Sequence, residues 1–119
     1  MSFIHIGIIQ LKTTADKQTN LETAALHVAK VKEQGAQMAI LPEMFLCPYA
    51  GDQFFHYAEE AQEESWCFLS EIAQKNNIIL IAGSVPKLEN GNFYNTSYVF
   101  DENGTCIGKH RKMKRRIYH

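Results

Sequence analysis

The chain contains few of the residues that interrupt or cross-link a fold. Its 119 residues include 3 prolines, 7 glycines and 3 cysteines, a composition that excludes collagen-like and disulfide-rich classes. Cys47, Cys67 and Cys106 are an odd set without metal-ligand spacing, so we expect a reducing, cytoplasmic setting. The five histidines show no ligand spacing either, and we expect no metal site.

Long hydrophobic runs are also missing. No apolar stretch approaches the roughly 18 residues that span a bilayer, and the N-terminus does not read as a signal peptide. No internal repeat, low-complexity segment or linker is found. With 45% hydrophobic and 21% charged residues, the sequence is typical of one globular domain at most, and no membrane partner is expected.

Negative charge is absent from the end of the chain. All 13 acidic residues precede residue 109, where they accompany 6 Lys or Arg, giving a charge of −7. The other 6 basic residues lie between Lys109 and Arg116. This basic block could bind nucleic acid, but it is short and is attached to an acidic body that phosphate would avoid. We therefore expect no nucleic-acid partner.

Hydrophobic periodicity predicts alternating strands and helices. Apolar, β-branched runs predict strands over 3–11, buried on both faces, and over 38–41 and 78–85. A helix is predicted between the first two, ending before Gly35 as a left-handed cap, and a second over 63–76. Two further strands around "DENG" form a hairpin. The order β-α-β-loop-α-β-β-β predicts an α/β fold with helices covering a mixed sheet.

Glu43 follows Pro42 on the loop that leaves the strand over 38–41. Loops at the carboxyl ends of strands build the sites of α/β proteins. Partial enclosure by Leu41, Phe45 and Tyr49 would disfavour the charged carboxylate and suit it to act as a general base. The alternative is an ordinary solvated loop glutamate.

Other candidates have alternatives of the same kind. Lys112 near a strand end can stabilise an oxyanion, or it can belong to a solvated basic surface. Cys47 is a tempting nucleophile four residues after Glu43, but residues this close on an irregular loop need not face each other. Asn95 and Thr96 are interpreted as turn or hairpin-edge residues. The cysteines in the predicted helix and strand, Cys67 and Cys106, are interpreted as small apolar residues.

In combination, several segments resemble the N-terminal part of the nitrilase superfamily of carbon–nitrogen hydrolases. The segments, in order, are "IGIIQL", "GAQMAILPEMF", "IAGSVP", "FYNTSYVFDENG" and "GKHRKM". The runs "LPEMFLCPYAGDQFFHYAE" and "YNTSYVFDENG" are most similar to the ω-amidase branch. The resemblance covers nearly the whole chain up to Met113.

The resemblance implies a fold, a reaction and site residues. The fold would be the N-terminal part of an α-β-β-α sandwich, commonly dimerised through its helical layer. Glu43 and Lys112 match the glutamate and lysine of a Glu-Lys-Cys triad, and Phe45 and Tyr49 match walls of the substrate pocket. The reaction would be hydrolysis of a small carboxamide to acid and ammonia through a thioester, without metal or organic cofactor. Both ω-keto-acid amides and deaminated-peptide amides fit the resemblance.

The sequence also departs from the family pattern. The family nucleophile lies in a "GxxICYD"-like segment about 40 residues beyond the lysine, and none of the three cysteines matches it. After Met113 the family usually continues "HLFD", whereas this chain has "KRRIYH". We therefore expect residues 1–119 to be a partial hydrolase domain with a divergent tail over 114–119, inactive alone, from a gene fragment, frameshift or deliberate truncation. The alternative is a non-catalytic α/β module that self-associates or binds a partner.

Overall fold

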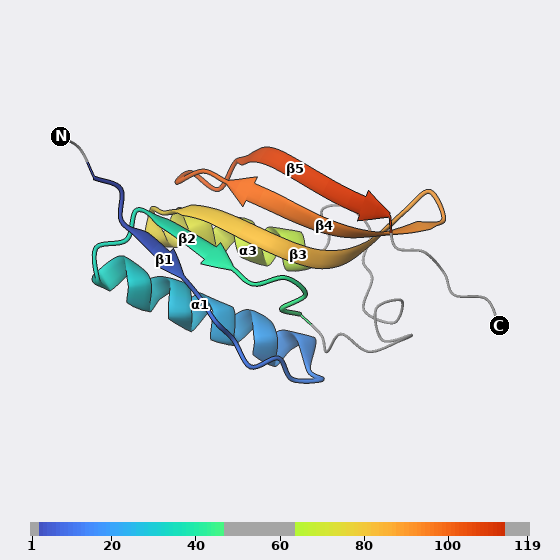
Figure 1. The fold of residues 1–119 in the computed structure, drawn as a ribbon, viewed down its shortest axis with the longest axis horizontal. Coiled ribbons are helices and arrows are strands. Elements are labelled where there is room, and N and C mark those ends of the chain that lie inside the picture. Colours follow the sequence, from blue (N-terminus) through green and yellow to red (C-terminus); the bar gives the residue numbers. More distant parts are fainter. Residues whose placement is uncertain (1–2, 47–63, 114–119) are drawn as a thin grey trace.

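The computed structural model describes residues 3–46 and 64–113, which form one mixed sheet and two helices (Figure 1). The five strands lie side by side in chain order. Strands β1, β2 and β3 are parallel, and β3, β4 and β5 are antiparallel. The predicted element order and mixed sheet are confirmed. The elements are β1 (Ile6–Ile8), α1 (Lys17–Glu33), β2 (Met38–Leu41), α3 (Glu64–Asn76), β3 (Ile79–Glu89), β4 (Asn92–Phe100) and β5 (Cys106–Met113).

Helix α1 has recognisable start and stop signals. The Asp16 side chain accepts a hydrogen bond from the backbone N–H of Gln18, which satisfies a donor that the helix start leaves unpaired. Lys30 and Lys32 lie in the last turn, where positive charge complements the helix dipole. Gly35 has φ +95°, which confirms the predicted left-handed residue after the helix.

Two hairpins join the last three strands. In the β4–β5 turn, the Asp101 side chain accepts hydrogen bonds of 2.9 Å from the backbone N–H groups of Asn103 and Thr105. This hairpin was predicted, but the one between β3 and β4 was not. It turns at Asn90 and Gly91, both at positive φ, as the Asn-Gly type I′ turn requires. Consequently β3 continues to Glu89, four residues beyond its predicted end.

Both helices cover the same face of the sheet. A Cβ on Gly7 would lie 2.7 Å from Cβ of Val31 on α1, so α1 packs closely on β1. On the same face, the Phe100 ring contacts the Trp66 ring of α3 with centroids 5.4 Å apart. Gly7 and Phe100 end one row of register partners that crosses β1 to β4, completed by Ala39 and Leu80.

The opposite face of the sheet is open among the described residues. We call the apolar surface on this side of the sheet the open face. It includes the side chains of Ile6 and Ile8, which are 50% and 74% exposed. The prediction that this first strand is buried on both faces is therefore wrong. The parallel strands follow each other in chain order, and the crossovers between them are right-handed. Both helices therefore lie on one face of the sheet, and neither covers the opposite face. The remaining members are Met38, Ile40, Ile79, Ile81 and Val99.

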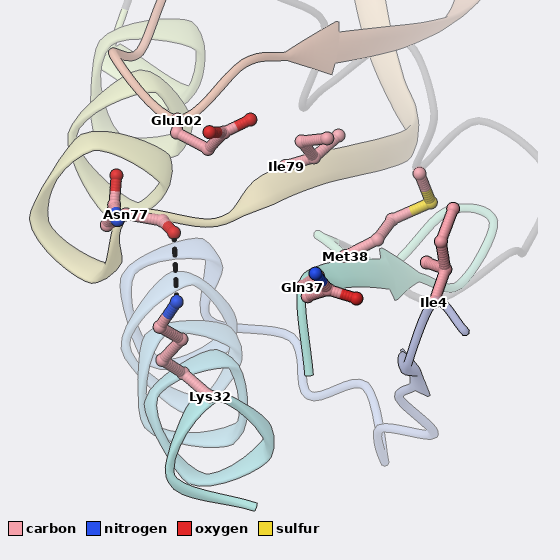
Figure 2. A pocket seen from close by; sticks show the side chains of 7 residues that line it. All are labelled: Ile4, Lys32, Gln37, Met38, Asn77, Ile79 and Glu102. Atoms are coloured by element: carbon pink, nitrogen blue, oxygen red, sulfur yellow. Dashed lines mark hydrogen bonds between the residues drawn. The ribbon is translucent and has the colours of Figure 1, made fainter. Parts of the chain in front are cut away.

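A pocket of about 300 Å³ lies at the edge of the sheet where β2 and β3 begin (Figure 2). Figure 2 shows the Lys32 side chain turned toward Asn77, whose backbone carbonyl accepts its hydrogen bond at 3.1 Å. This contact joins α1 to the start of β3. The described helices include none that is long and apolar enough to cross a membrane.

The turn glycines allow a matched test of packing. Gly104 and Gly91 both have φ near +80°, but only at Gly104 would a Cβ meet a neighbour, Ser70 O at 2.8 Å. We expect Gly91→Ala to cost about 1–2 kcal/mol for the left-handed backbone alone. Gly104→Ala should cost a further ~1–3 kcal/mol, because α3 must shift. Urea unfolding followed by circular dichroism measures both, and equal losses would contradict the close packing of this turn on α3.

Candidate active site

Glu43 and Lys112, which are 69 positions apart, line one pocket of about 280 Å³. Glu43 follows the carboxyl end of β2, and Lys112 lies near the end of β5. Because β5 runs parallel to β3 through their shared antiparallel neighbour, these ends reach the same edge of the sheet. The fold thus brings the two predicted residues together. The other lining residues are Gly83, Ser84, Asn95, Ser97 and His110.

The pocket lies on the uncovered side of the sheet. Asn95 is paired in register with Lys112, and Ser97 with His110. Alternate residues of a strand share a face, so Asn95 and Ser97 continue the row that holds Val99 of the open face. The sheet therefore has a polar end that forms the floor of the pocket and an apolar end beside it.

The loop that carries Glu43 is held at two points. The backbone N–H of Met44, which has φ +53°, donates to Ser84 Oγ at 3.2 Å. A left-handed non-glycine residue is uncommon and persists when its surroundings fix it. Two residues further, the Leu46 carbonyl accepts a 2.6 Å hydrogen bond from Nδ2 of Asn20, a buried residue of α1. The position of Glu43 is therefore set by β3 and α1 as well as by β2.

Glu43 is exposed, so the predicted enclosure by Leu41 and Phe45 is wrong. Both side chains point into the core below the helices, with exposures of 2% and 0%. Residues 43–46 form a turn beyond the end of β2, and in this turn Glu43 is exposed whereas the three residues after it are buried. The structure gives Phe45 a packing position away from the pocket, and its contact with substrate stays a prediction. Tyr49 lies outside the described residues.

Asn95 is a residue of the pocket that the sequence interpretation placed incorrectly. It lies within β4, not at a hairpin edge, and its Nδ2 donates a 3.0 Å hydrogen bond to Oε1 of Glu43. Its Oδ1 and the Thr96 hydroxyl are buried and have no hydrogen-bond partner among the described residues. A usable signal was present in "NTS", since Asn95 and Ser97 are polar at two-residue spacing in an otherwise apolar strand.

Strand alternation divides the described part of the basic block between two faces. Lys109 and Arg111 lie on the face away from the pocket, where both pair with Glu89; the Lys109 Nζ to Glu89 Oε1 distance is 2.8 Å. The Arg111 guanidinium also lies 4.5 Å from the centroid of the Tyr94 ring. Lys112 points to the pocket and, within the described ranges, forms no ion pair. The described basic residues are therefore not one continuous patch.

Neither described cysteine lines this pocket. Cys67 is exposed on α3, and Cys106 on β5 donates its thiol hydrogen to the Gly108 carbonyl at 3.3 Å. Cys47 lies outside the described residues. Over residues 3–46 and 64–113, no three or more His, Cys, Asp or Glu side chains are grouped so as to hold a metal ion.

Nearly all of the sequence matches a protein family model. The model describes the carbon-nitrogen hydrolases and matches residues 5–118. The chain belongs to the carbon-nitrogen hydrolase family. Its relatives include the mouse omega-amidase NIT2, 41% identical over 113 residues, which are 95% of this chain and 41% of the mouse protein.

Two further proteins have a comparable sequence identity to this chain. A hydrolase of Schizosaccharomyces pombe is 40% identical over 110 residues, covering 91% of this chain and 34% of the yeast protein. The crystal structure of Saccharomyces cerevisiae Nit3, of branch 10 of the nitrilase superfamily, superposes with a TM-score of 0.85 at 38% identity, covering 92% of this chain and 44% of Nit3. The fold is thus that of the nitrilase superfamily. This chain spans less than half the length of these relatives.

The Glu89 cluster gives this carbon-nitrogen hydrolase chain a testable pH dependence. The hydrogen bond from Lys109 holds the pKa of the Glu89 carboxyl below its ordinary value of 4.5, against the opposing effect of partial burial. A lowered pKa adds stability above the unfolded-state value, and this is lost as the pH falls through the folded-state value. Glu89→Gln should therefore cost less than about 1 kcal/mol at pH 7, since both cations are largely solvated.

The difference between the two proteins should shrink as the pH falls below 4.5 and disappear only below the lowered folded-state pKa of Glu89, and it should also shrink in high salt. Urea unfolding of both proteins at pH 7 and at acidic pH measures it. A loss that persists undiminished at low pH would show that Glu89 stabilises the sheet by packing and not by charge.

Proposed function

We propose that this chain supplies the general base and the oxyanion-stabilising cation of a hydrolase that cleaves small carboxamides to acid and ammonia. The single observation that carries the proposal is the meeting of Glu43 and Lys112 in one pocket on the uncovered face. Membership of the carbon-nitrogen hydrolase family and similarity to omega-amidases support the reaction class.

The chemistry follows from the two groups and a cysteine thiol. Glu43 takes the thiol proton as sulfur attacks the carboxamide carbon, and Lys112 stabilises the oxyanion that forms. The C–N bond then breaks, and the proton on Glu43 passes to the leaving amine as ammonia departs. Glu43 next takes a proton from water, which attacks the thioester to release the acid and restore the thiol.

The nucleophile of this scheme is not assigned to a residue of this chain. Cys67 and Cys106 do not line the pocket, and Cys47 lies outside the described residues. We propose that a cysteine outside residues 1–119 supplies the thiol, and that the 119-residue chain alone does not release ammonia from an amide.

The uncovered face supports a second part of the proposal, that the chain associates with another protein surface. A contiguous apolar area of this kind marks an interaction surface in soluble proteins. The occupant would be a second copy of the chain or the remaining portion of a hydrolase domain. The same surface would serve the alternative function, a non-catalytic partner-binding module.

A chimera tests the catalytic roles. Residues 1–113 of this chain replace the matching segment of the mouse omega-amidase NIT2, which supplies the rest of the domain. We expect ammonia release from a small dicarboxylate monoamide, with kcat lowered about 10²–10⁴-fold by Glu43→Gln and about 10²–10³-fold by Lys112→Ala.

The controls are a glutamate and a lysine outside the pocket. Glu89→Gln and Lys109→Ala alter the same residue types on the opposite face and should leave kcat within about twofold of the chimera. Cys47→Ala should also retain activity. Loss of turnover in Cys47→Ala, or ammonia release by the 119-residue chain that depends on Cys47, would overturn the assignment of the nucleophile.

Association is tested by sedimentation velocity on the 119-residue chain. We expect dimers or larger species at micromolar concentration, because a monomer would leave the apolar side chains of the open face in water. Ile8→Lys on that face should shift the distribution toward monomer, whereas Leu26→Lys, equally exposed on α1, should not. A compact, stable wild-type monomer would contradict the proposal, and an effect of Leu26→Lys alone would move the interface to the helical layer.

A further inference from the structure

We propose that Asn95 is a positioning residue that holds the Glu43 carboxylate with its amide nitrogen and accepts a hydrogen bond from the Lys112 ammonium with its amide oxygen. The inference rests on the proposed function and deepens it. In this proposal a residue of β4 lies between the general base Glu43 and the cation Lys112. It holds both side chains in the pocket without a direct ion pair between them.

The first contact is present in the structure. Nδ2 of Asn95 lies 3.0 Å from Oε1 of Glu43. An ionised carboxylate only accepts hydrogen bonds, so the NH₂ group and not the carbonyl of Asn95 must face Glu43. This fixes the amide orientation, and the Oδ1 atom is directed elsewhere.

The second contact is implied by an unpaired atom. Oδ1 of Asn95 is buried and lacks a hydrogen-bond partner within the described part of the chain, and such unpaired buried atoms are rare in native proteins. Lys112 is its register partner on β5, both residues line the pocket, and the ammonium has three donors. No described acceptor bonds to that ammonium in this structure. Asn95 Oδ1 is thus a buried acceptor without a described donor, and the register partner of Asn95 carries an ammonium without a described acceptor.

With Asn95 bonded to both Glu43 and Lys112, each of these two side chains keeps atoms that are free to take part in the reaction. With Asn95 on Oε1, the other oxygen of Glu43, which accepts no hydrogen bond from a described residue, remains available to take a proton. With one N–H of Lys112 on Oδ1, two N–H groups remain for an oxyanion. A direct ion pair between Glu43 and Lys112 would instead occupy the groups that the reaction needs, and no such pair forms within 4 Å among the described residues.

The kinetic test compares two asparagines of β4 in the chimera. Asn95→Asp keeps the shape of the side chain but replaces the donor to Glu43 by a second carboxylate oxygen. Asn92→Asp makes the same chemical change at an exposed position outside the pocket. We expect kcat to fall about 10- to 100-fold in Asn95→Asp, the scale of a misplaced catalytic group, with KM within about threefold. Asn92→Asp should match the parent, and Asn95→Ala should resemble Asn95→Asp.

A second measurement on the 119-residue chain does not need turnover. A double-mutant cycle with Glu43→Ala and Asn95→Ala, read by urea unfolding, should give a coupling of more than about threefold in the folding equilibrium constant. Equal kcat for Asn95→Asp and Asn92→Asp in an active chimera overturns the positioning role. If the parent chimera is inactive, the result counts against the proposed function and not against the role of Asn95. The double-mutant cycle then tests Asn95 by itself. A coupling factor near one would overturn the contact between Asn95 and Glu43.

Discussion

The structure depends on one topological constraint, the right-handed crossover between parallel strands. Strands β1, β2 and β3 follow each other in chain order, so each crossover delivers its helix to the same face. That face becomes the core, where side chains such as Leu80 and Phe100 are fully buried. Within residues 3–46 and 64–113 the opposite face receives no helix, and the antiparallel strands β4 and β5 extend it beyond the end of β2. Its apolar side chains therefore remain exposed in the described part of the chain.

Successive side chains of a strand point to opposite faces of the sheet, so this alternation decides which polar and charged residues reach the pocket. In β5 it sends Lys109 and Arg111 to the Glu89 cluster and Lys112 to the pocket. In β4 it sends Asn95 to the pocket and Thr96 to the buried side. A run of basic residues in the sequence is thus divided between two faces of the sheet, one with ion pairs to Glu89 and one that lines the pocket. The function of a charged residue in such a strand depends on its parity more than on the charge of its neighbours.

The sequence predicted the elements whose signals are local. Helix α1 with its cap at Gly35, strand β2, helix α3 and the turn at Asp101 all follow from patterns within a few residues. The exposure of Ile6 and Ile8 did not follow, because an apolar strand is the same whether its second face is covered by another layer or left open. The Asn90-Gly91 hairpin had a local signal and was still missed. Strand β3 was predicted to end before it, so the turn had no incoming strand.

The site shows the same division between local and long-range information. Motif resemblance selected Glu43 and Lys112, and the fold brought them to one pocket. It did not select Asn95 or Ser84, whose contacts with the Glu43 loop join β4 and β3 to a segment about 40–50 positions earlier. The polar spacing in "NTS" marks Asn95 as a position on one face of a strand, but a single sequence does not show that this face meets the Glu43 loop.

The supporting contacts nevertheless explain why an exposed carboxylate can have a defined position. A glutamate on a free loop would sample many rotamers, and ordering it would cost side-chain entropy. Here the backbone after Glu43 is held by Ser84 at a left-handed residue, and its carboxylate is held by Asn95. Both holding residues belong to the sheet, and a side chain supported from regular elements in this way has a defined position. Exposure of Glu43 is then a consequence of its place on the open face and is compatible with precise orientation.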